Sequence, residues 1–157
     1  YLVAKAKEIG YFPKIISSGR KINDGMAEYV FNRTKMHLKD QNDSLKLKKV
    51  CIFGITFKED CPDVRNSQVI KIVNKFRKNG SIVHVHDPVS NDDNVWNEFS
   101  IRLKKKLRKN YYDIIILAVP HKVFHNLGVK KIKSFLKKKS TLYDLKWMFK
   151  SEYSDLR

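Results

Sequence analysis

The sequence has few of the residues that cross-link or anchor small proteins. Only two of its 157 residues are cysteine, and Cys51 and Cys61 belong to no cluster with metal-ligand spacing. Two thiols are too few for a disulfide framework, so we expect both to be reduced, as in a cytoplasmic protein. The longest apolar run, residues 114–119, is much shorter than the ~18 residues that a membrane helix needs. We therefore expect no membrane span.

Acidic residues are also scarce relative to basic ones. The chain has 33 Lys and Arg against 16 Asp and Glu, which gives a net charge of +17. Such an excess is typical of nucleic-acid-binding proteins. The basic residues are spread along the chain, however, and most are lysines, which cannot fork onto phosphates or bases as arginine does. We favour a solvated basic surface, with a basic nucleotide- or nucleic-acid-binding module without catalysis as the alternative.

The length and the apolar content predict a folded domain. A hydrophobic fraction of 42% and an aromatic fraction of 11% exclude a disordered chain. A chain of 157 residues is about one ordinary domain, large enough for a real core. It begins with Tyr1 rather than Met and has no signal peptide, which we interpret as a piece of a longer protein.

The first 45 residues read as helical. Apolar residues at helical spacing predict a short helix over residues 1–11 and a long one from Pro13 to about residue 39. The long helix would span roughly 38 Å, more than a small domain needs. We therefore expect it to pack against another subunit or a further domain. Residues 40–44 form a polar break and a plausible boundary.

The pattern after the break predicts strands that alternate with helices. The expected strands are residues 49–53, 81–86, 113–119 and 141–145. The expected helices are residues 66–79, capped by Asn66 or Ser67, and residues 96–107 and 129–136. This order predicts an α/β fold: a Rossmann-like open parallel sheet with flanking helices, preceded by the long helical segment.

Ligands of such a sheet bind outside the carboxyl ends of its strands. Three predicted loops meet there, formed by residues 54–67, 87–88 and 120–122. No Gly-x-Gly-x-x-Gly segment occurs in the chain, so the sheet lacks the usual dinucleotide signature.

The first of these loops carries the strongest candidate site. Lys58 and Arg65 lie close to a predicted helix N-terminus, which already favours an anion. Phe57 beside Lys58 suits a base or ribose ring lying against a phosphate. We therefore expect Lys58 and Arg65 to share one hollow, shaped for a pyrophosphate. The alternative is that Phe57 is core, Lys58 is surface, and Arg65 pairs with Asp63 or with Asp60.

Residues 53–67, Phe-Gly-Ile-Thr-Phe-Lys-Glu-Asp-Cys-Pro-Asp-Val-Arg-Asn-Ser, resemble the signature of the UDP-glucose/GDP-mannose dehydrogenase family of nucleotide-sugar dehydrogenases. Residues 1–26 resemble the family's central helical region, and residues 85–88 the end of a strand in its C-terminal domain. The later stretches, residues 118–122, 142–146 and 154–157, resemble the subgroup that oxidises UDP-N-acetylhexosamines for surface polysaccharides.

The resemblance implies an enzyme that oxidises a sugar C6 alcohol to a carboxylate with two NAD⁺. It assigns residues 1–45 to part of a central helical region that builds a homodimer, and residues 46–157 to the C-terminal UDP-sugar-binding domain. The implied substrate is UDP-N-acetylglucosamine or UDP-N-acetylgalactosamine, with UDP-glucose as the alternative. Phe57, Lys58 and Lys146 would bind the substrate, and Arg65 would reach NAD held mainly by an N-terminal domain.

The chain departs from the family at the nucleophile. The family's catalytic cysteine lies in a Gly-Gly-x-Cys segment that would precede Tyr1, and Cys51 and Cys61 match neither its position nor its surroundings. We therefore expect no catalytic residue and no dehydrogenase activity in this chain alone.

The remaining candidates are predicted to be structural. His84 and His86 share a strand face without the partners of a metal site, so we expect no metal. Asp63 and Asp144 are expected to brace the loops that carry Arg65 and Lys146. Trp147 is expected in a core or an interface rather than on a ligand.

Overall fold

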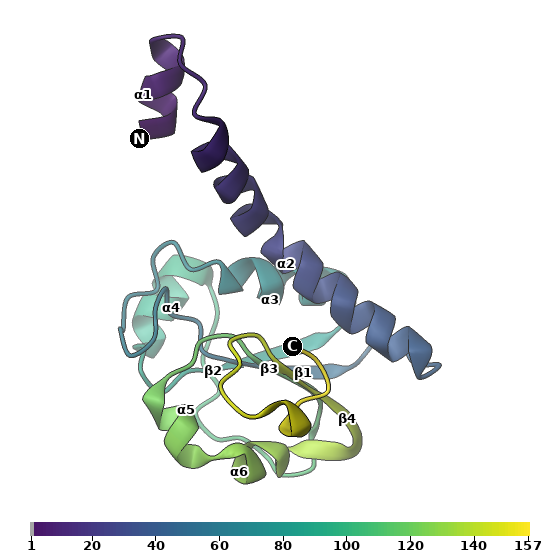
Figure 1. Cartoon of the computed structure of the whole chain (residues 1–157). Coiled ribbons are helices and arrows are strands. Elements are labelled where there is room, and N and C mark those ends of the chain that lie inside the picture. The colour runs from purple at the N-terminus through teal and green to yellow at the C-terminus, as the bar shows by residue number, and fades with distance from the viewer. Residues whose placement is uncertain (1) are drawn as a thin grey trace.

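The computed structural model describes residues 2–157, so Tyr1, the first residue of the first predicted helix, lies outside the described residues. Its centre is a four-stranded parallel sheet in the order β2-β1-β3-β4 (Figure 1). The strands are β1 (Lys49–Phe53), β2 (Ile82–His86), β3 (Tyr112–Leu117) and β4 (Leu136–Asp144). The predicted fold class is confirmed.

Both faces of the sheet are covered. Alternate residues of the two central strands point to opposite faces, as in any pleated strand, and nearly all are fully buried. Val50 and Ile114 face the core beneath α2 (Lys14–Asp40) and α3 (Val69–Lys78). Cys51 and Ile115 face the second core, against α5 (Lys122–Leu127) and α6 (Val129–Lys133). Continuous apolar runs are what a sheet buried on both faces requires.

The carboxyl-terminal half of α2 packs against α3. The rings of Phe31 and Phe76 meet edge to face with centroids 5.3 Å apart. Lys71 forms an ion pair with Asp24 at 2.8 Å, and Lys75 forms another with Glu28. These contacts join the long helix to the sheet domain.

The amino-terminal half of α2 extends away from the sheet together with α1 (Leu2–Glu8), as Figure 1 shows. Ile15, Ile16 and Ile22 of this half are exposed. Among residues 2–157, no helix combines the length and apolar character that crossing a bilayer requires.

The helix predicted over residues 96–107 is wrong in both bounds. α4 (Asp92–Phe99) begins earlier, because the Asn91 side chain accepts a hydrogen bond from the Asp93 amide at 2.8 Å. It ends at Phe99, because the next residue, Ser100, has the left-handed φ of 54°. Beyond it the chain turns back, and the Leu103 amide donates to Asp92 at 2.7 Å.

The last predicted helix and strand also shift. α6 ends at Lys133, so residues 134–136 are not helical and β4 begins at Leu136 rather than at residue 141. An irregularity in the β3–β4 pairing, between Tyr112 and Ile114, accommodates the extra residues of β4. The short helix α5 was not predicted. A 3₁₀ turn, η1 (Ser151–Tyr153), follows near the end of the chain.

The turn after β1 requires glycine. Gly54 has a φ of +87°, and a Cβ atom at this position would lie 2.5 Å from Cβ of Val119. This close approach brings the loop after β1 directly against the end of β3. Both the backbone conformation and the available space therefore exclude a side chain.

Replacing Gly54 by Ala should destabilise the chain by about 2–4 kcal/mol, since the new methyl group adds a clash to an unfavourable φ. Gly128→Ala is the matched control: its φ is +78°, but nothing lies within 4 Å of the added Cβ. Urea unfolding of both variants measures the difference. Equal losses in the two variants would contradict the tight contact at Gly54.

Candidate functional site

The three loops predicted to meet at the carboxyl edge of the sheet are joined by buried hydrogen bonds. The Ile55 amide donates to the Asp87 carboxylate at 2.7 Å, and the Asp60 amide donates to Nδ1 of His121 at 2.9 Å. Residues from the ends of β1, β2 and β3 therefore form one connected edge, as expected for ligand binding in an open α/β sheet.

A hollow of about 220 Å³ lies at this edge. It is formed by the loop after β1, the start of α3, the end of β3 and one residue of α2. Its main lining residues are Asn23, Thr56, Phe57, Lys58, Glu59, Ser67, Gln68, Pro120 and Lys146. Three of the four predicted site residues, Phe57, Lys58 and Lys146, thus come together from segments almost ninety positions apart.

The hollow suits an anion attached to a ring. Within residues 2–157, neither Lys58 nor Lys146 forms an ion pair, and both side chains are exposed. The Phe57 ring is 64% exposed, so the alternative that places Phe57 in the core is wrong. Two unpaired ammonium groups attract a phosphate, and an exposed aromatic face accepts a base or a sugar.

Arg65 lies elsewhere, and the expectation of one hollow shared with Lys58 is wrong. Its guanidinium forks onto Asp63, with Nη2 at 2.7 Å and Nε at 3.0 Å, as one of the alternatives predicted. Arg65 lines a separate hollow of about 340 Å³ that also includes Glu98. The reason is a closed loop: the Phe57 amide donates to the Asp63 carbonyl at 2.8 Å, which folds the segment back on itself.

Two aspartates brace these loops as predicted. The buried Asp144 carboxylate accepts hydrogen bonds from the amides of Lys146, at 3.2 Å, and Phe149, at 2.9 Å. Asp63 accepts the Arg65 amide at 3.0 Å in addition to its guanidinium. Each carboxylate therefore fixes the backbone that carries a candidate cation.

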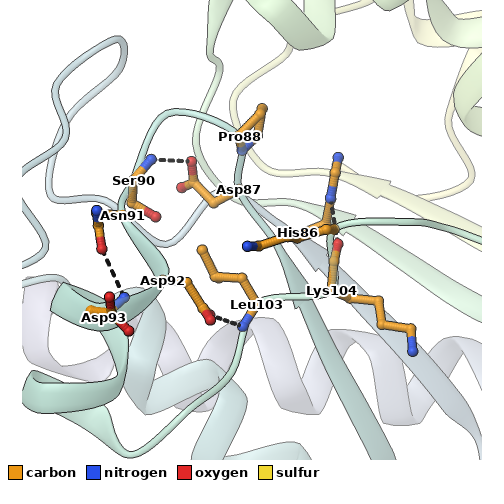
Figure 2. A pocket seen from close by; sticks show the side chains of 10 residues that line it. His86, Asp87, Pro88, Ser90, Asn91, Asp92, Asp93, Leu103 and Lys104 are labelled. Carbon is orange, nitrogen blue, oxygen red and sulfur yellow. Dashed lines mark hydrogen bonds between the residues drawn. The ribbon is translucent and has the colours of Figure 1, made fainter.

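A larger hollow of about 460 Å³ opens beside the end of β2. Figure 2 shows Asp87 at its wall, with the Ser90 amide donating to the carboxylate. Asp87 also accepts from the amides of Ile55 and Val89 and from His121. Burial opposes ionisation of this carboxyl, but the hydrogen bonds from these donors lower its pKa below the ordinary value.

The sequence interpretation missed this role, because it treated Asp87 only as a turn residue before Pro88. The available signal was an aspartate directly after a strand of a parallel sheet. His121 was likewise noted only as a loop residue, although it is fully buried.

A fourth, largely apolar hollow of about 360 Å³ adjoins the first, with which it shares Asn23, Gln68, Val69, Ala118 and Lys146. It lies between α2 and the ends of β3 and β4. Trp147 lines it and is 70% exposed, so within this chain Trp147 is not a core residue. The Arg157 guanidinium lies 5.5 Å from the centroid of its ring. The site therefore has a polar half and an apolar half that meet at Lys146.

Residues 51–151 match the family model described as "UDP-glucose/GDP-mannose dehydrogenase family, UDP binding domain". The chain belongs to this family. The matched region contains all four strands except the first two residues of β1, and it contains Phe57, Lys58, Arg65 and Lys146. The resemblance found in the sequence is thereby confirmed.

Relatives in the UDP-glucose/GDP-mannose dehydrogenase family extend the similarity to the helical segment. The chain is 38% identical over all 157 residues to the UDP-N-acetyl-D-glucosamine 6-dehydrogenases of Salmonella typhi and Pseudomonas aeruginosa. It spans 37% of the length of each of these curated relatives.

Solved structures agree. The UDP-N-acetyl-mannosamine dehydrogenase from Staphylococcus aureus matches with a TM-score of 0.70 at 27% identity, over 96% of this chain and 32% of that one. The NDP-N-acetyl-D-galactosaminuronic acid dehydrogenase from Methanosarcina mazei matches with a TM-score of 0.74 at 24% identity, over 85% of this chain and 28% of that one. The second likeness shows the shared fold.

The Arg65 fork lowers the pKa of Asp63 to about 2. Because the folded pKa is depressed, the fork is complete at neutral pH. Its contribution to stability declines as the pH falls below the ordinary aspartate value of about 4, and the fork itself is lost as the pH falls through about 2. A ¹³C NMR titration of the carboxyl group should find a midpoint of about 2, and Arg65→Gln should raise it towards the ordinary range, since only the backbone amide of residue 65 then still donates to Asp63. An unchanged midpoint in the variant would show that Arg65 does not hold Asp63.

Proposed function

We propose that this chain is the UDP-sugar-binding C-terminal portion of an NAD-dependent nucleotide-sugar 6-dehydrogenase. The proposed substrate is a UDP-N-acetylhexosamine, either UDP-N-acetylglucosamine or UDP-N-acetylgalactosamine, with oxidation to the uronic acid for surface polysaccharides. Support comes from the two bacterial relatives, which are UDP-N-acetyl-D-glucosamine 6-dehydrogenases. Residues 1–45 would belong to the central helical region, and residues 46–157 to the substrate-binding domain.

One observation carries the proposal: Lys58 and Lys146, from opposite ends of the sheet domain's sequence, line the same hollow. A UDP-sugar carries two phosphate charges between a flat base and a sugar ring. Each lysine would neutralise part of that charge, and Phe57 would lie against one of the rings. The chain thus supplies binding energy and orientation rather than covalent chemistry.

Arg65 would face the dinucleotide. Bound NAD⁺ would accept the hydride from the sugar C6 in such an enzyme. Arg65 is the one candidate contact to NAD in this chain, because the sequence has no Gly-x-Gly-x-x-Gly segment. The Arg65 side chain is 75% exposed, so it can reach a ligand outside its own hollow.

The long helix would form the homodimer. Its amino-terminal half presents the exposed side chains of Ile15, Ile16 and Ile22. Covering such a face with a second copy of the helix is favourable, because it removes apolar surface from water.

Neither cysteine suits the proposed thiol chemistry. Cys51 is fully buried in β1, and burial raises the pKa of its thiol far above the ordinary value, so it cannot form a thiolate nucleophile. Cys61 lies on the loop after β1 and is not part of a Gly-Gly-x-Cys segment, which carries the nucleophile in this family. The nucleophile would therefore come from another part of the enzyme.

Titration of UDP against this chain tests the binding role. Lys58→Ala and Lys146→Ala should each weaken binding by about tenfold, because each removes one charge-assisted contact to phosphate. Lys138→Ala is the matched control, since that exposed lysine of β4 lies outside the hollow. Calorimetry measures the dissociation constants.

The same titration separates the alternatives. Equal affinity in the wild type and in both site variants would contradict the proposed site. Tight, steeply salt-dependent binding of an unrelated DNA oligonucleotide, with no binding of UDP, would favour a basic nucleic-acid-binding module instead.

This chain alone should form no NADH when mixed with NAD⁺ and UDP-N-acetylglucosamine, because its sequence has neither a Gly-Gly-x-Cys nor a Gly-x-Gly-x-x-Gly segment. Absorbance at the NADH wavelength measures the result, and a full-length relative serves as the positive control. NADH production by the isolated chain would overturn the division of roles proposed here.

A further inference from the structure

We infer that His121 is a positioning residue for the proposed substrate: it holds the backbone of Lys58 in place through Thr56. This inference rests on the proposed function, because it concerns how the UDP-binding lysine is oriented. His121 follows β3 and lies outside the hollow that contains Lys58.

The imidazole of His121 is fully buried and contacts three residues in two segments. The Asp60 amide donates to Nδ1 at 2.9 Å. Nε2 lies 3.2 Å from Oδ2 of Asp87 and 3.2 Å from Oγ1 of Thr56. The ring therefore links the end of β3 both to the end of β2 and to two points of the loop after β1.

These contacts determine the tautomer. Nδ1 accepts a backbone hydrogen bond, so its lone pair is occupied and the ring proton of the neutral imidazole lies on Nε2. Nε2–H then donates to Asp87 and Thr56. The Thr56 hydroxyl can accept this bond because its own proton goes to the Lys58 carbonyl, at 2.9 Å.

A continuous chain of contacts thus runs from the buried Asp87 carboxylate through His121 and Thr56 to the Lys58 carbonyl. A second branch fixes Asp60, which adopts a left-handed φ of 55°. The Asp60 carboxylate accepts the Lys122 amide at 2.9 Å, which pins the same turn from α5. The loop that presents Lys58 is therefore held on both sides by Asp87, His121 and Lys122, which lie outside the hollow.

This geometry allows the roles of the two ring nitrogens, Nδ1 and Nε2, to be tested separately. In His121→Asn the side-chain oxygen can replace Nδ1 as the acceptor for the Asp60 amide. In His121→Gln the longer amide can replace Nε2 as the donor but removes that acceptor. Both variants lose similar packing, so a purely structural role predicts the same result for both.

The experiment measures hydrogen exchange of the Asp60 amide and UDP affinity in the same samples of this chain. We expect strong protection in the wild type, retained protection with about tenfold weaker UDP binding in His121→Asn, which loses the donor to Thr56, and lost protection with about threefold weaker binding in His121→Gln, which keeps that donor. His125→Asn is the control, because His125 is exposed on α5 and only stacks on Phe149.

Thr56→Val provides a second test if a histidine variant does not fold. It removes only the hydroxyl between Nε2 and the Lys58 carbonyl, and it should weaken UDP binding about tenfold while the Asp60 amide stays protected. Unchanged UDP affinity in Thr56→Val, or equal affinities in the two histidine variants, would overturn the inference.

The outcomes also distinguish the two proposals. A wild-type chain that binds no UDP contradicts the proposed function. The exchange data still test the role of His121. Loss of Asp60 protection in His121→Gln supports the positioning of the loop by Nδ1, and unchanged protection overturns it.

Discussion

Burial of the Asp87 carboxylate is the constraint on which the candidate site depends. A carboxylate removed from water must have its oxygens satisfied, and in this chain the donors are the Ile55, Val89 and Ser90 amides and the His121 ring. These donors belong to three different strand ends. The requirement to satisfy one buried charge therefore fixes where the loop after β1 crosses the edge of the sheet.

The placement of the cations follows from that arrangement. Lys58 lies on the loop that Asp87 and His121 hold by hydrogen bonds. Lys146 follows Asp144, whose carboxylate accepts a hydrogen bond from the Lys146 amide. Both side chains remain free of acidic partners among the described residues, whereas Arg65, seven positions after Lys58, is engaged by Asp63. The large net charge of +17 is therefore less informative than the two lysines that the fold leaves unpaired in one hollow.

Much of the fold could be predicted from the sequence because its strong signals are local. Strands β1 and β3 contain the uninterrupted apolar runs 50–53 and 114–117, and such runs occur in sheets covered on both faces. The helix predicted over residues 96–107 was wrong, although Trp96, Phe99, Leu103 and Leu107 repeat at helical spacing. The Asp92 carboxylate overrides that pattern by binding the Leu103 amide.

The candidate site was predictable only in part. The motif around Phe57 and Lys58 predicted a loop that lines the hollow, and Lys146, which lines it too, was predicted by resemblance alone. The separation of Arg65 from Lys58 depends on the hydrogen bond between Phe57 and Asp63, which closes the loop and has no periodic signature. The role of His121 depends on contacts across 34 and 61 positions of the chain, which residue patterns do not reveal.

A crystal structure of this chain with UDP tests the central claim most directly. The account predicts that the diphosphate lies in the hollow between Lys58 and Lys146, with phosphate oxygens within hydrogen-bonding distance of both ammonium groups and a ring against Phe57. A nucleotide bound instead beside Asp87 at the end of β2, or one that leaves both lysines without contact, would contradict it.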